Sequence, residues 1–375
     1  MMEKKSISAA MKPLLRLSRI FGLHLILRKE LATSLLFAYS LSIFSLLGYA
    51  AFGVILWLQN VDYHLYDSLM HISIEKAQKG FLYFNYMTIF GATIYYNKPF
   101  NKIITDFEKV DKCLVQIGMP ITYKMDSIIV TCIAKFLSLA ILVVLDYFLS
   151  SDTHWLFTVC DLVATHGPLM PIFIYELHFF AIMTYISQHF RFIKVKLEET
   201  IVNIAFENQL TKIYELIRIY DDLRTMSTEL NKVVSIPILI TVASIFCLGI
   251  VNVHLIGIAG SYQRDLLLTF LIGYLLLRMY ELWTILQPFV ITTKEVNLFN
   301  AVLFRFMILD RTGVFTKDEK LYLHLVMKKG ICFTAWEFFN LDYTLIQSVV
   351  GASSTILVIL IQYSLSKREL WCEET

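Results

Sequence analysis

The chain has few charged residues and few cysteines, and each scarcity narrows the possible protein classes. Only 17% of its 375 residues are charged, against about 25% in a typical soluble chain. Its six cysteines show no paired spacing, so neither a disulfide framework nor a metal site is predicted. The low charge content therefore disfavours a soluble domain.

Motifs of several functional classes are also missing. The sequence has no His-Glu-x-x-His motif and no paired intramembrane aspartates, which argues against an enzyme. It has no Asp-Arg-Tyr or Asn-Pro-x-x-Tyr element, which a metabotropic receptor would carry. It shows no internal repeat, so a transporter built from inverted repeats has no support. We predict no catalytic residues, no metal, no cofactor and no nucleic-acid partner.

Long apolar runs are what the sequence has in abundance. Hydrophobic residues make up 57% of the chain and aromatic residues 14%. A membrane-spanning helix needs about 17–25 mostly apolar residues, and the runs predict an all-α integral membrane protein with seven transmembrane helices. The predicted spans are 31–59, 80–97, 127–149, 156–190, 233–260, 266–291 and 343–366. The first run is too long for a signal peptide and is interpreted as a retained span.

The basic residues predict how the spans are oriented. With a cytoplasmic N-terminus, the inner segments carry 26 of the 33 Lys and Arg residues and the outer segments carry 5. By the positive-inside rule, we expect a cytoplasmic N-terminus and an extracellular C-terminus. The expected organisation is a cytoplasmic segment 1–30, a six-helix membrane bundle 31–291, a cytosolic linker with the first part of helix seven 292–342, a membrane helix 343–366 and an extracellular tail 367–375.

The inner loop around residues 195–230 has apolar residues at helical spacing, including Leu197, Ile213, Leu216 and Tyr220. One interpretation is that spans four and five continue as long helices into the cytosol and pack on each other. The alternative is that this surface binds a cytosolic partner.

Ionisable residues within the spans are costly in a bilayer and therefore informative. Arg278 and Glu281 are three residues apart on one helix and are expected to neutralise each other. Lys135 and Glu176 lie on neighbouring spans and could pair. We expect His166 to bond a carbonyl that Pro168 and Pro171 leave free; the alternative is that it acts as a pH switch.

The last span has one narrow stripe of small and neutral polar residues. At about 100° per residue, Thr355 and Gln362 share a face with Gly351, Val358 and Ser366. Such a stripe can mediate close helix packing. It can also line a pore, where neutral polar groups face ions; one stripe per chain then requires an oligomer.

The segment TILVILIQY, residues 355–363, is similar to the signature of insect gustatory receptors: Thr-Tyr, five hydrophobic residues, then Gln-Phe. Thr355, the hydrophobic five and Gln362 match, while Ile356 and Tyr363 depart from it. The run FFNLDYTL, 338–345, and the N-terminal KPLLRLSRIFGL, 12–23, also resemble that family, which is related to the insect odorant receptors.

The resemblance implies a tetrameric, ligand-gated, non-selective cation channel in the plasma membrane of a sensory neuron. The last helix of each subunit would line the pore, with Gln362 and Tyr363 at its constriction, and long cytosolic helices would hold the tetramer together. The partners implied are a small-molecule tastant, membrane lipid, and identical or related subunits forming a homotetramer or hetero-oligomer.

The family places its ligand in a pocket among the helices, open to the outside. Aromatic walls with a few polar groups suit such a pocket, although aromatic residues also gather at the membrane interface. The candidate pocket residues are Tyr83, Phe84, Tyr86, Asp146, Tyr147, Trp155, His166 and Tyr274.

Leu357 stands where sugar-sensing members tend to carry a glutamate, so a bitter or plant-derived compound is favoured. A sugar receptor and an odorant-receptor-type subunit remain alternatives.

Overall fold

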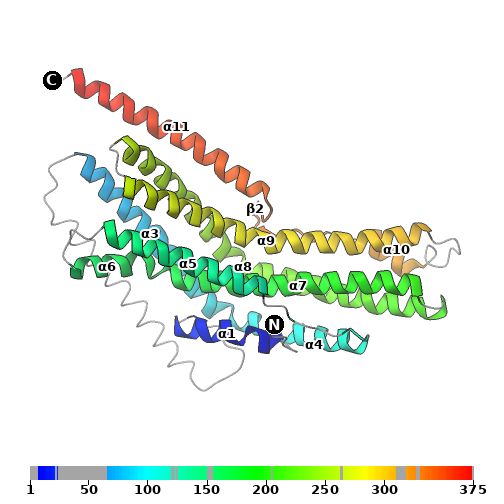
Figure 1. Cartoon of the computed structure of the whole chain (residues 1–375). Helices are drawn as coiled ribbons and strands as arrows, with labels where there is room; N and C mark the ends of the chain where they lie inside the picture. Colours follow the sequence, from blue (N-terminus) through cyan, green and yellow to red (C-terminus); the bar gives the residue numbers. More distant parts are fainter. Residues whose placement is uncertain are drawn as a thin grey trace.

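The computed structural model describes residues 7–21, 23, 66–119, 123, 126–149, 155–203, 206–261, 265–309, 318–326 and 330–373. Within them the fold is a bundle of helices with one short antiparallel hairpin (Figure 1). The elements are α1 (Ile7–Ile20), α3 (Tyr66–Tyr95), α4 (Asn97–Gln116), α5 (Asp126–Leu149), α6 (Trp155–His166), α7 (Leu169–Asn203), α8 (Phe206–Ser261), α9 (Asp265–Leu309), α10 (Glu319–Val326), β1 (Thr334–Ala335), β2 (Phe339–Asn340) and α11 (Thr344–Glu373).

Four described helices are long and apolar enough to cross a membrane. They cover Asp126–Leu149, Leu162–Ile201, Leu210–Gly257 and Asp265–Leu309, and they contain most or all of the third to sixth predicted spans. The second predicted span lies largely in α3 and the last in α11. The first predicted span, 31–59, lies outside the described residues.

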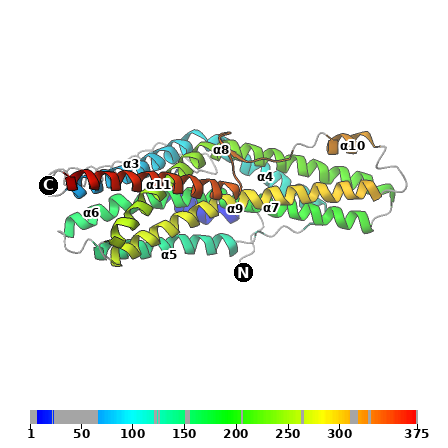
Figure 2. The ribbon, with the colours of Figure 1, turned by 90° about the horizontal axis from the view of Figure 1, so that it is seen from above.

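Three helices extend far beyond a bilayer. The longest, α8, has 56 residues, which is about 84 Å at 1.5 Å per residue. The hydrocarbon core is only about 30 Å thick. Figures 1 and 2 show α7, α8 and α9 running side by side past the end of α5, toward α10. The expectation of long helical extensions is confirmed.

The extensions pack on each other through the apolar stripe that the sequence shows. Leu197, Ile213, Leu216 and Tyr220 are buried. The Tyr220 ring stacks on Phe299 of α9, with ring centroids 4.7 Å apart. The stripe between 195 and 230 therefore forms a helix–helix core, which accounts for its apolar spacing without a separate partner.

Two shorter helices cover one side of the bundle. In α1 the buried residues are Ile7, Ala10, Met11, Leu14, Leu15 and Ser18, and in α4 they are Phe100, Ile103, Ile104, Phe107, Val110, Asp111 and Leu114. Both sets follow the i, i+3, i+4 spacing that places one face against the core. Asp111 is a carboxylate within that apolar face.

The segment before the last helix differs from the expectation. Helix seven was expected to begin within residues 292–342, but 334–340 form the β1–β2 hairpin, with Thr334 paired to Asn340. Trp336 and Glu337 at its turn have φ angles of 47° and 63°, which a right-handed helix does not allow. Asp342 then accepts a hydrogen bond from the backbone N–H of Thr344 at 2.9 Å. This side-chain cap starts α11 at Thr344.

The helix also ends later than predicted. α11 continues to Glu373, through most of the stretch expected to be an extracellular tail. It ends at the opposite end of the bundle from α10, as both views show. The long extensions and the end of α11 therefore lie at opposite ends of the bundle.

Candidate functional site

The last helix stands at the edge of the bundle. Figure 1 shows α11 diverging from the other helices as it leaves the hairpin. Its first turns are anchored, because Leu345 is buried and Ile346 and Val349 pack on the core. Beyond them Val350, Val358 and Ile359 are each at least half exposed. The described side chains between Val350 and Gln362 are therefore largely available to lipid or to other chains.

The predicted polar stripe lies on this exposed part. Gly351, Thr355, Val358 and Gln362 are all exposed in the single chain. Tyr363 and Ser366 also belong to α11, but their side chains lie outside the described part. The bundle of the single chain thus does not use the four described stripe residues for its internal packing.

The hydroxyl groups on α11 donate to their own helix. Thr355 Oγ1 donates to the Gly351 carbonyl at 3.1 Å, and Ser354 Oγ donates to the Val350 carbonyl at 2.8 Å. Donating inward leaves the oxygen lone pairs of both hydroxyls as acceptors on the helix surface. The described polar surface of α11 can therefore accept hydrogen bonds from water or contact a cation.

A network of buried charges ties α5, α7 and α9 together. Lys135 of α5 bonds Glu176 of α7, and both side chains are nearly fully buried. Arg278 of α9 binds Glu281 at 2.6 Å and the Tyr274 hydroxyl at 2.6 Å. Both pairs expected from the sequence are confirmed. Tyr274, a candidate pocket residue, is therefore a partner of Arg278. The Arg278 guanidinium also lies over the Tyr274 ring, 4.8 Å from the ring centre.

A second polar pair joins two candidate pocket residues. His166, at the end of α6, places Nε2 2.8 Å from Asp146 Oδ2 on α5. The expectation that His166 bonds a freed carbonyl is wrong, because its Nε2 meets a carboxylate on a neighbouring helix and its Nδ1 has no partner among the described residues. The two side chains are 5% and 14% exposed, so they form a polar point in a mostly apolar region.

The other candidate pocket residues are scattered. Tyr86 is buried and Tyr83 is partly buried on α3, whereas Phe84 and Tyr147 are more than half exposed on the outside of the bundle. The Trp155 side chain lies outside the described part. The structure brings Asp146 and His166 together, but it does not gather Phe84 and Tyr147 with them.

A third buried cluster was not anticipated from the sequence. Asp111 of α4 accepts hydrogen bonds from the Tyr123 hydroxyl and from Nε2 of His189 on α7, the latter at 2.9 Å. Burial, followed by the Asp111 charge, raises the pKa of Tyr123. A carboxylate within the apolar stripe of α4 was the sequence signal that could have pointed to this cluster.

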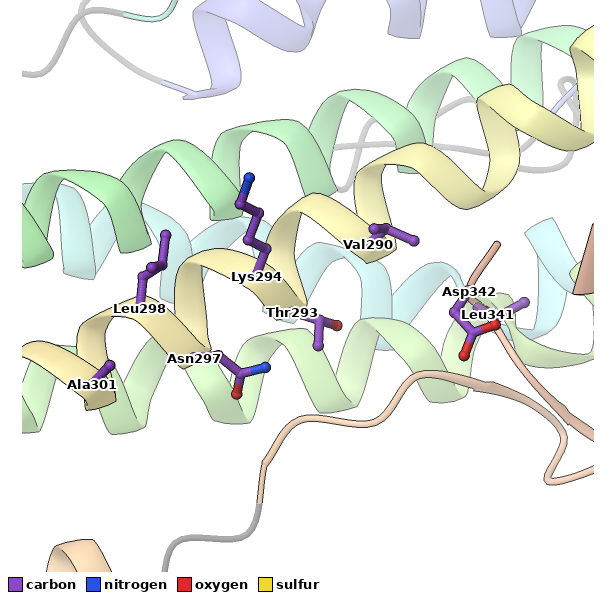
Figure 3. Close-up of a pocket in the computed structure, with 8 residues that line it drawn as sticks. All are labelled: Val290, Thr293, Lys294, Asn297, Leu298, Ala301, Leu341 and Asp342. Atoms are coloured by element: carbon purple, nitrogen blue, oxygen red, sulfur yellow. The ribbon is translucent and has the colours of Figure 1, made fainter. Parts of the chain in front are cut away.

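An open groove lies on the extension of α9, beside the chain that leads into α11. It has a volume of about 520 Å³ and is lined by Val290, Thr293, Lys294, Asn297, Leu298, Ala301, Leu341 and Asp342. Figure 3 shows these side chains along one stretch of α9, with Leu341 and Asp342 on the segment that leads into α11. None of the candidate pocket residues lines this groove.

The family model described as "7tm Chemosensory receptor" matches residues 11–367. The chain belongs to this chemosensory receptor family. No sequence among the curated proteins matches the chain. Membership agrees with the helical membrane fold and with the resemblance found around residues 355–363.

Solved structures support the same fold. The insect olfactory receptor OR5 from Machilis hrabei in complex with eugenol superimposes with a TM-score of 0.66 at 14% identity, covering 95% of this chain and 98% of that one. A second structure of the same receptor gives a TM-score of 0.65 at 13% identity, with the same coverage. This chemosensory receptor therefore has the seven-helix fold of the insect olfactory receptor, as its sequence predicted.

Proposed function

We propose that this receptor is a gustatory-type subunit of a tetrameric, ligand-gated, non-selective cation channel. Its family and its fold are those of insect chemosensory receptors. In the proposed assembly, four copies of α11 surround a central pore. Gly351, Thr355, Val358, Gln362, Tyr363 and Ser366 face that pore.

The observation that carries this proposal is the exposure of the α11 stripe. Packing within the subunit would bury Thr355 and Gln362, yet both are exposed. Facing lipid would leave an amide without partners in hydrocarbon, which is unfavourable. A pore supplies water and ions to the same groups, and an amide oxygen can contact a cation without the cost of burying a charge.

Assembly requires surfaces that join subunits, and the helix extensions offer one. The groove on α9 is open in the single chain and combines apolar residues with Lys294 and Asp342. We place the contact with a neighbouring subunit here, on the cytosolic side. The neighbour is an identical chain or a related receptor, and membrane lipid surrounds the outer helices.

The ligand we propose is a small, largely apolar organic molecule, such as a bitter or plant-derived compound. The related OR5 structure is a complex with eugenol, a small molecule. Asp146 and His166 form a polar contact near the ends of α5 and α6 that would lie on the extracellular side if the N-terminus is cytoplasmic. They supply a polar anchor in an apolar pocket, the arrangement that small-molecule sites use.

A gustatory role is favoured over an odorant role by the segment 355–363, where Thr355 and Gln362 match the gustatory signature. The olfactory receptors among the similar structures keep the odorant-type subunit as the second candidate. Leu357 in place of a glutamate argues against a sugar receptor. We place the protein in the plasma membrane of a sensory neuron.

Expression of the chain in oocytes, with current recorded against a panel of tastants, tests the channel. We expect a ligand-evoked cation current, and Gln362→Ala should change its conductance or relative ion permeability without preventing assembly. Ile356→Val, on another side of α11, is the matched control and should leave permeation unchanged. Surface expression without current under any ligand or with any co-subunit would refute the channel proposal.

A further inference from the structure

A small cavity lies where α3 meets α4. It is lined by Ala92, Thr93, Tyr96, Phe100, Tyr175, His178, Phe179, Val233 and Val234. Tyr96 is the residue between the end of α3 and the start of α4. The cavity thus touches α7, α8 and the junction of two helices.

His178 presents an unused acceptor at this cavity. The residue is 1% exposed, and its Nδ1 atom lies 2.7 Å from the Ile174 carbonyl oxygen. A carbonyl only accepts hydrogen bonds, so Nδ1 carries the hydrogen. In the neutral ring Nε2 then has a lone pair. Within the described residues no group donates to it.

The ring is held neutral by its surroundings. A protonated ring would bury a positive charge, and such charges are tolerated when an acid pairs with them. None of the residues that line this cavity is acidic. The nearby Glu176 is already bonded to Lys135. The group that fills the cavity must therefore donate a hydrogen bond to Nε2.

A second histidine on the same helix has a partner at each of its two ring nitrogens. His189 also places Nδ1 near a carbonyl four residues earlier, the Tyr185 oxygen at 2.8 Å. Its Nε2, however, is 2.9 Å from Asp111. The two rings share one backbone contact, but Nε2 of His189 donates to a carboxylate, whereas Nε2 of His178 has no partner among the described residues.

The size of the cavity identifies which molecule can donate a hydrogen bond to His178 Nε2. The space open to the centre of a water-sized sphere is about 10 Å³, which is room for about one water molecule. A drug-sized ligand needs about 300 Å³ or more. Thr93 Oγ1 donates to the Phe90 carbonyl at 2.8 Å, so its oxygen can accept from the occupant. The hydroxyls of Tyr96 and Tyr175 add further polar groups on the lining side chains.

We propose that one ordered water molecule occupies this cavity, donates a hydrogen bond to His178 Nε2, and links α7 to the α3–α4 junction. The water has the donors that the bare nitrogen requires, and buried waters commonly make about three hydrogen bonds to groups that would otherwise lack partners. The site is separate from the α11 stripe and from the Asp146–His166 pair, so it does not depend on the channel proposal.

A map of the full-length receptor in lipid nanodiscs, at a resolution that shows ordered water, tests this directly. We expect a density peak about 2.7–3.2 Å from His178 Nε2 and no such peak at His189 Nε2, which Asp111 already occupies. An empty cavity in a map that shows other buried waters would overturn the proposal. So would a tyrosine hydroxyl bonded directly to Nε2.

Radiolytic labelling of the same receptor in ¹⁸O water gives a second readout, because radiolysis converts a bound water into a hydroxyl radical that oxidises the side chains beside it. Tyr175 and Phe179 should be labelled despite their burial, while the buried Phe299, which does not line this cavity, should not. His178→Phe should lower the labelling of Tyr175 several-fold, and His178→Gln, which keeps an acceptor, should retain more of it. Equal labelling of Tyr175 and Phe299 in the unmodified receptor would contradict the proposal even if His178→Phe fails to fold.

Discussion

The Lys135–Glu176 pair gives the sharpest stability prediction. Their side chains are 2% and 3% exposed, and they join α5 to α7. Lys135→Met would leave the buried Glu176 carboxylate without the cation that neutralises it. Breaking a buried pair in this way costs about 3–5 kcal/mol of the free energy of unfolding. Since about 1.4 kcal/mol changes an equilibrium constant tenfold, the ratio of folded to unfolded protein should fall a hundredfold or more.

The double variant separates the loss of the pair from the loss of packing. Lys135→Met combined with Glu176→Met removes both charges and keeps side chains of similar length. Replacing a buried ion pair with apolar residues is often close to neutral, so the double variant should be more stable than either single variant. Arg278 and Glu281 remain paired on α9 in every case.

Unfolding of the purified receptor in a denaturing detergent, followed by tryptophan fluorescence, measures these free energies. The double-mutant cycle should give a favourable interaction energy of about 2 kcal/mol or more between the two positions. The reasoning is refuted if Lys135→Met is neutral, or if the effects of the single variants simply add.

Three further outcomes follow from polar contacts in the bundle. Asp146→Asn and His166→Gln should each raise the ligand concentration for half-maximal current without altering ion permeability, and a changed permeability with unchanged ligand response would contradict a pocket role. Burial, followed by the hydrogen bond to Asp318, raises the pKa of Tyr214 to about 12. The neutral Tyr214 side chain therefore stabilises the fold below pH 10.0, the ordinary tyrosine pKa, and this stabilisation is lost as the pH rises toward 12. The difference in melting temperature between the unmodified protein and Tyr214→Phe should shrink over that range, and a constant difference would refute the assignment. Tyr220→Phe removes the hydrogen bond from Asn300 Nδ2 at 2.7 Å but keeps the stacking on Phe299, so it should destabilise the receptor by about 1 kcal/mol. Tyr220→Ala, which also removes the stacking, should destabilise it far more in the same unfolding assay.

Much of the fold follows from patterns that are local in the sequence. Apolar runs of sufficient length predicted the helices that hold Lys135, Glu176 and Arg278. The i, i+3 spacing predicted the Arg278–Glu281 bond. The period of about 3.6 residues also placed Thr355 and Gln362 on one face, and the structure leaves both exposed.

What could not be predicted depends on how helices meet. The Asp146–His166 bond requires the relative position of α5 and α6, and the Asp111–His189 bond joins residues 78 positions apart. The turn at Trp336 and Glu337 adopts positive φ angles without glycine, so no residue there signalled the end of a helix.

The central claim is that the Thr355–Gln362 face of α11 lines the pore, and cysteine accessibility tests it most directly. Gln362→Cys, Thr355→Cys and the control Ile356→Cys would each be expressed, and a charged thiol reagent applied during ligand-evoked current. The account predicts block of current at positions 355 and 362 and none at 356, with the unmodified receptor insensitive to the reagent. Block at 356 with none at 355 and 362 would contradict it.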